Sequence, residues 1–131
     1  MLNKRLLCKF LLGAALIAVS PGVASAEQIL AQGTFTGKSG HQTSGSVSIV
    51  KTASGVEARL GANFSLDGAP APWLGFGNNG KYNDRTQFSK LRKNTGAQVY
   101  KLPAAIDASK YKEFYVWCAP FNVPLGVAKL K

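Results

Sequence analysis

The chain has 131 residues, with 16 basic and 6 acidic side chains, a formal charge of +10 and 46% hydrophobic residues. This length fits one ordinary domain and is too short for two separate cores. Two cysteines and one histidine exclude a zinc site of four cysteines, one of two cysteines and two histidines, and a blue-copper centre.

The first 26 residues have the three parts of a secretory signal peptide. A basic segment (residues 1–9) precedes an apolar run (residues 10–19), and residues 24–26 read Ala-Ser-Ala, the small-x-small pattern that signal peptidase cuts. The apolar run is shorter than the roughly 20 residues of a membrane-spanning helix. We therefore expect cleavage after residue 26, export to the periplasm or the extracellular space, and no membrane anchor after cleavage.

Cleavage would leave 105 residues with 13 basic and 6 acidic side chains, one cysteine (Cys118) and one histidine (His41). A single cysteine excludes an intrachain disulfide. The basic residues are scattered along the mature chain, and export separates it from nucleic acid. We therefore expect no metal site and no nucleic-acid partner.

Turn-forming residues punctuate the mature chain about every eight to twelve residues, which is typical of short antiparallel strands. The clearest apolar alternation runs over residues 56–66, where every second residue is apolar from Val56 to Leu66. A turn over residues 52–55 precedes it, so residues 44–66 are expected to form a β-hairpin.

Six further segments are predicted to be strands: 28–36, 45–51, 72–77, 98–102, 113–118 and 123–130. The polar residues 78–95 are expected to form a loop with one helical turn near residues 87–91. Seven short strands without an amphipathic helix predict an all-β fold of residues 27–131, either an antiparallel β-sandwich or a Greek-key barrel.

Cys118 lies at the end of a predicted strand, on the same face as Phe114 and Val116. One interpretation is a small buried hydrophobe, a common role of free cysteine. The other is a redox thiol or a haem ligand, because an unpaired thiol in an oxidising compartment is exposed to oxidation and a thiolate can bind haem iron. In the second interpretation Trp117 would shield the thiol.

His41 lies in a turn-rich connector, residues 38–45. A single loop histidine is most often a surface or hydrogen-bonding residue. The functional interpretation makes it a second haem ligand, or the base that lowers the pKa of Cys118. Both of these roles require His41 to lie near Cys118.

Two further segments carry a pattern. Residues 75–80 match G-x-G-x-x-G, but no amphipathic helix follows to hold a pyrophosphate, so we interpret the match as coincidental. Residues 81–93 contain five cations against Asp84 alone. They would suit an acidic redox partner or an anionic surface, or they form a solvated loop.

The order of landmarks along the mature chain resembles the DM-thirteen (DM13) electron-transfer domain, a small extracellular module that accompanies DOMON domains. The matching pieces include residues 33–35 (Gly-Thr-Phe), 41–47, 96–103 and 116–128, and the resemblance covers residues 31–131. It implies a β-sandwich with a redox role centred on one cysteine, as a bare thiol or as the ligand of a prosthetic group such as haem.

Cys118 occupies the position of that cysteine. The chain departs from the family at residues 69–71, where Ala-Pro-Ala replaces the frequent Gly-Pro-Asp. Our leading hypothesis is an exported electron-transfer or accessory domain, rather than a stand-alone enzyme, with Cys118 as the redox group. The alternative is a non-catalytic binding module with a structural cysteine. A third interpretation is an anion-binding accessory domain that uses Arg85, Arg92 and Lys93.

Overall fold

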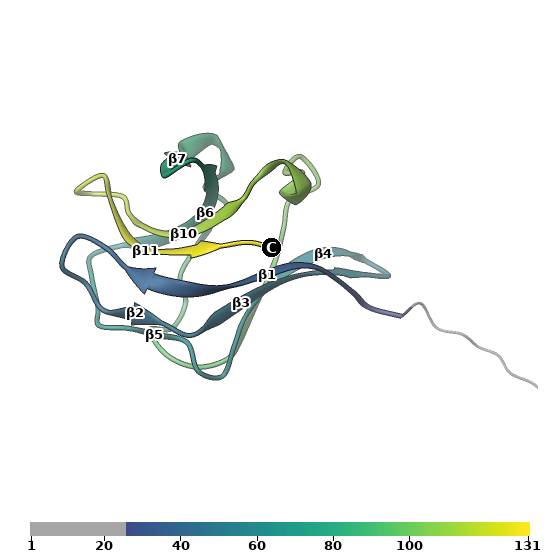
Figure 1. The fold of residues 1–131 in the computed structure, drawn as a ribbon, viewed down its shortest axis with the longest axis horizontal. Coiled ribbons are helices and arrows are strands. Elements are labelled where there is room, and N and C mark those ends of the chain that lie inside the picture. Colours follow the sequence, from purple (N-terminus) through teal and green to yellow (C-terminus); the bar gives the residue numbers. More distant parts are fainter. Residues whose placement is uncertain (1–25) are drawn as a thin grey trace, which may run out of the picture.

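The computed structural model describes residues 26–131 (Figure 1). The predicted signal peptide lies outside these residues, except for Ala26. None of the helices in the described part has the length and apolarity needed to cross a bilayer. The elements are β1 (Gln28–Gly37), β2 (Thr43–Ser44), β3 (Ser46–Thr52), β4 (Gly55–Leu60), β5 (Ser65–Leu66), β6 (Pro72–Asn78), β7 (Lys81–Asn83), the 3-10 helix η2 (Asp84–Thr86), β8 (Ser89–Lys90), β9 (Gln98–Lys101), the 3-10 helix η3 (Ala108–Lys110), β10 (Glu113–Cys118) and β11 (Val123–Lys129).

The strands form one curled antiparallel sheet in the order β7-β6-β10-β11-β1-β3-β4-β9, with β8 beside β6 and a separate pair of β2 and β5. Strand β1 joins the two halves, because its first residues pair with β3 and its last three pair with β11. In Figure 1 the sheet folds over, so that β6, β10 and β11 lie above β1 and β3. This confirms the predicted all-β class.

The core fills the space between the two halves of the sheet. Phe114 on β10 is fully buried, and its ring lies 5.1 Å from that of Phe76, 6.1 Å from that of Phe35 and 6.3 Å from that of Phe88. These centroid distances are in the range of favourable aromatic pairs. One side chain thereby ties β10 to both β6 and β1.

The prediction of one strand over residues 56–66 was wrong. Strand β4 ends at Leu60, and the Phe64 N–H closes a turn by donating to the Gly61 carbonyl at 3.0 Å. The Asn63 side chain holds this turn, because its Oδ1 accepts from the Ser46 N–H at 3.0 Å. The apolar period continues past the turn into β5, which pairs with β2 in the separate sheet.

The polar stretch after β6 also differs from the prediction. It contains β7, η2 and β8, and its helical turn lies at Asp84–Thr86 rather than near residues 87–91. Asn83 explains the position, since its Oδ1 accepts from the Arg85 N–H at 3.0 Å and caps the turn. The Thr86 hydroxyl donates back to the Asn83 carbonyl at 2.6 Å.

Phe114→Ala is expected to lower the free energy of unfolding by about 3–5 kcal/mol, because it leaves a cavity between the two halves of the sheet. Phe121→Ala is the matched control, since Phe121 is 69% exposed; there we expect a change within about 0.5 kcal/mol. Urea unfolding of both variants measures the difference. Equal losses would contradict the placement of Phe114 at the centre of the core.

Candidate functional site

Cys118 is the last residue of β10, where it pairs with Pro72 of β6 and Val123 of β11. Its side chain is 2% exposed and packs in the core on the same face as Phe114 and Val116. This confirms that Cys118 shares a face with these two residues, and it shows that the face points inward. The thiol donates a hydrogen bond to the Pro70 carbonyl, with 3.4 Å between Sγ and the oxygen.

The Pro70 carbonyl belongs to residues 67–71, the connection between β5 and β6, which we call the cover segment. Ala71 ends this segment with φ at 41°, in the left-handed region that costs an ordinary L-residue roughly 1–2 kcal/mol. The backbone beside the thiol is therefore strained in this chain.

His41 holds the other end of the cover segment. Its Nδ1 lies 2.9 Å from the Asp67 Oδ1, and the Gln42 N–H donates to the Asp67 Oδ2 at 2.9 Å. The Gln42 hydrogen bond and then the His41 hydrogen bond hold the pKa of Asp67 below its usual value. The structure thus joins His41 and Cys118 to the same short segment, through different residues of it.

The two predicted haem ligands do not fit a haem. Cys118 is almost fully buried and bound to a carbonyl, and His41 is bound to a carboxylate. An open cavity of the described residues and a smaller one beside Leu130 are both lined by other side chains. Residues 26–131 contain no group of three or more histidine, cysteine or acidic side chains placed to hold a metal ion.

The opposite face of β10 carries an aromatic layer. Trp117, predicted to shield the thiol, lies on this outer face with Tyr115, and Tyr82 of β7 completes the layer. The Tyr82 and Trp117 rings are stacked, with centroids 4.2 Å apart and planes at 10°. The Tyr115 ring lies 5.3 Å from that of Tyr82 and 6.1 Å from that of Trp117. Burial raises the pKa of both tyrosines above its usual value.

Tyr115 has a charged partner on its own strand. Its hydroxyl donates to the Glu113 carboxylate at 2.9 Å, and that carboxylate also accepts from the Gly80 N–H at 3.0 Å. Glu113 itself is 8% exposed. A buried carboxylate is thereby held against a buried phenol.

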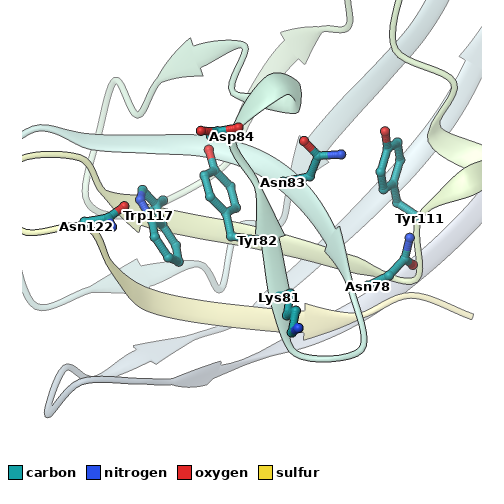
Figure 2. Close-up of a pocket in the computed structure, with 8 residues that line it drawn as sticks. All are labelled: Asn78, Lys81, Tyr82, Asn83, Asp84, Tyr111, Trp117 and Asn122. Atoms are coloured by element: carbon teal, nitrogen blue, oxygen red, sulfur yellow. The ribbon is translucent and has the colours of Figure 1, made fainter.

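An open cavity of about 530 Å³ lies beside Tyr82 and Trp117 of the aromatic layer. Figure 2 shows the lining residues, with the Tyr82 and Trp117 rings next to each other. The lining of this cavity is mainly polar apart from three aromatic rings. The residues that line it are Asn78, Lys81, Tyr82, Asn83, Asp84, Tyr111, Trp117 and Asn122.

Glycines of the G-x-G-x-x-G segment make room for the aromatic layer. A Cβ on Gly75 would lie 2.6 Å from the Tyr82 hydroxyl oxygen, and one on Gly77 would lie 2.7 Å from Cε2 of Tyr115. The segment continues into the β6–β7 hairpin through Asn79 and Gly80, both with positive φ, as a two-residue Asn-Gly turn requires. Its glycines therefore serve ring packing and a hairpin turn.

The basic segment does not form one uniform patch. The Arg92 guanidinium lies 4.0 Å from the centre of the Tyr100 ring, and the Lys90 ammonium lies 5.8 Å from the centre of the Trp73 ring. Lys81, in contrast, lines the open cavity. The cations near the aromatic layer are therefore only a part of the predicted docking segment.

Sequence reasoning missed Tyr82, Glu113 and Tyr115 as members of a site. The signal was present in β10, where Glu113, Tyr115 and Trp117 alternate with three core residues. Only the position of β7 over the sheet brings Tyr82 to that face, and no local pattern predicts that position.

The family model described as electron transfer DM13 matches residues 34–130. The match covers most of the chain, so this protein belongs to the electron transfer DM13 family. Searches of curated proteins and of solved structures gave no match.

Asp67→Asn is expected to make the Cys118 thiol react several-fold faster with an aromatic disulfide reagent. The substitution weakens the bonds to His41 and Gln42, so the cover segment should open more often. Asp107→Asn is the matched control: the Asp107 carboxylate accepts from Ser109 and its pKa is also lowered. Equal acceleration in both variants would contradict the role of Asp67.

The contribution of Asp67 to stability should depend on pH. Because its pKa is lower in the folded chain than the value of about 3.9 in unfolded peptides, the stabilisation is complete above the unfolded pKa. It is lost as the pH falls through the folded pKa. Urea unfolding of the wild type and of Asp67→Asn should therefore differ near neutral pH and converge in acid. A constant difference would show that the carboxylate charge is not what stabilises the segment.

Proposed function

From its membership of the electron transfer DM13 family, we propose that this chain is an exported electron-transfer domain whose redox group is the bare thiol of Cys118. The observation that carries the proposal is the single hydrogen bond from this thiol to the strained cover segment. The thiol lies at the end of an interior strand, next to a connecting segment of five residues to which it is hydrogen-bonded. Export rests on the signal-like residues 1–26.

The chemistry that suits a single thiol is exchange with a disulfide of a partner. The Cys118 sulfur attacks one sulfur of the partner disulfide, a new S–S bond forms, and the other partner sulfur leaves as a thiolate. The proton of the Cys118 thiol ends on that leaving sulfur. One reducing equivalent thereby passes from Cys118 to the partner: the Cys118 sulfur rises to the disulfide level, and one partner sulfur falls to the thiol level. Attack of a second thiol, supplied by the partner, on the Cys118 sulfur's bond partner would return Cys118 to the thiol.

Such an exchange requires the cover segment to move, because the thiol is 2% exposed. Release of the Ala71 backbone from its positive φ offsets part of the cost of that opening. His41 acts on this step by holding Asp67, and it takes no part in the exchange itself.

A second candidate is a binding module in which Cys118 is a structural residue. The specific observation in its favour is the burial of the thiol in the hydrophobic core beside Phe114 and Val116. In this version the acidic partner suggested by the basic segment would bind elsewhere on the surface.

The two candidates differ in how the Cys118 thiol becomes reactive. For a redox thiol, reaction with an aromatic disulfide should proceed through local opening, with a rate that barely changes at low urea concentrations. For a structural cysteine, the rate should rise with urea in step with global unfolding. The measurement is the rate of mixed-disulfide formation at several urea concentrations, followed by mass.

Cys118→Ser and Cys118→Ala test the same question through stability. The redox proposal expects both variants to lose the exchange reaction while they stay folded. Serine is the closer mimic in size. A structural cysteine predicts a loss of about 1–3 kcal/mol for serine if its hydroxyl is buried without a partner. Unfolding of either variant at neutral pH would favour the structural role.

A further inference from the structure

The outer face of β10 holds a second group of redox-capable side chains that does not include Cys118. Trp117 and Tyr82 are stacked at 4.2 Å, a geometry in which the two π-systems overlap. Tyr115 contacts both rings at centroid distances of 5.3 and 6.1 Å. The three oxidisable rings of this aromatic layer are therefore continuous from a buried position to the open cavity.

The two phenols of this layer differ in their proton acceptors. The Tyr82 hydroxyl donates to the Gln87 amide oxygen at 3.1 Å, and an amide does not take up a proton near neutral pH. The Tyr115 hydroxyl donates to the Glu113 carboxylate at 2.9 Å, which is a base. Tyr115 is thus the phenol that can lose an electron and pass its proton to a neighbour.

We propose that Tyr115, Trp117 and Tyr82 form a one-electron relay to a partner's one-electron oxidant, such as an oxidised metal centre, at the open cavity. The oxidant takes one electron through the stacked rings. Tyr115 becomes a neutral tyrosyl radical, and its proton moves to the Glu113 carboxylate, which becomes a carboxylic acid. Return of one electron, and of the proton from Glu113, restores the phenol.

The surroundings favour this use of the layer. Tyr115 is 2% exposed, so its radical is protected from solvent, while Tyr82 and Trp117 are partly exposed and line the cavity (Figure 2). Gly75 and Gly77 lack the Cβ atoms that would push the two tyrosine rings away from β6. The relay goes beyond the proposed function, because no step of it uses the Cys118 thiol.

Pulse radiolysis with the azide radical tests the relay on the mature domain. The azide radical removes one electron from an exposed indole, giving azide anion and an indolyl radical, with the indole proton released to water. If the relay exists, the absorption band of the indolyl radical decays as that of the tyrosyl radical grows. The electron comes from Tyr115, the Tyr115 proton goes to Glu113, and the indole regains a proton from water.

Trp117→Phe should lose this growth of the tyrosyl band, whereas Trp73→Phe should keep it. Trp73 is the matched control because it is the cross-strand partner of Trp117.

Three variants identify the donor. Tyr115→Phe should lose the tyrosyl growth, and Glu113→Gln should slow it several-fold, because glutamine accepts the hydrogen bond but not the proton. Tyr111→Phe should keep it, since Tyr111 lines the cavity but packs against Phe76. Circular dichroism verifies that each variant is folded, and Glu113→Gln tests the same step if Tyr115→Phe does not fold.

Other outcomes would overturn the relay. Full tyrosyl growth in Tyr115→Phe, loss of growth in Tyr111→Phe, or an unchanged rate in Glu113→Gln would each contradict it. Tyr82→Phe should retain the growth of the tyrosyl band, because the phenylalanine ring still stacks on Trp117. Loss of that growth in Tyr82→Phe would identify Tyr82 as the electron donor and overturn the role of Glu113. Cys118→Ala should leave the transfer unchanged, so failure of the thiol proposal and failure of the relay are separate results.

Discussion

The period-two alternation of strand β10 is the constraint on which both redox-capable groups depend. Successive side chains of a strand point to opposite faces, so Phe114, Val116 and Cys118 enter the core while Tyr115 and Trp117 form part of the outer layer. Hydrogen bonds to β6 and β11 on the two sides fix this register. A slip of one residue would exchange the two faces and lose the core and the aromatic layer together.

The neighbouring strand β6 supplies space on that outer face. Opposite Tyr115 the ladder places Gly75, and opposite Glu113 it places Gly77. Side chains at these two positions would occupy the volume in which the tyrosine rings lie. The pairing of small residues on β6 with large residues on β10 therefore determines the position of the Tyr115 and Tyr82 rings. The β6–β7 hairpin places Tyr82 over Gly75.

Local alternation was enough to predict most strands and the face that Cys118 shares with Phe114 and Val116, because both follow from a repeat within six or seven residues. Which way that face points depends on the packing of the two halves of the sheet, so the alternation left it open. The alternation failed at residues 56–66, where the Asn63 side chain accepts a hydrogen bond from the Ser46 N–H. A turn ends the strand there, although the apolar alternation of the sequence continues through it. Such a hydrogen bond joins residues far apart in the sequence, so no periodic pattern records it. The same limit explains why Asp67 was not expected beside His41 and Tyr82 was not expected beside Trp117.

The two faces of β10 differ in the group that accepts a hydrogen bond from the redox-capable side chain. The Cys118 thiol donates to a backbone carbonyl, which does not accept a proton, so its proton must leave with the partner's sulfur and the reaction suits exchange. The Tyr115 phenol donates to a carboxylate, which does accept a proton, so it suits loss of a single electron. In the proposed exchange a disulfide would reach the thiol after the cover segment moves, whereas in the proposed relay a one-electron oxidant would meet Tyr82 and Trp117 at the open cavity. Two partners of different chemistry can thus use one strand from its two sides without competing for the same surface.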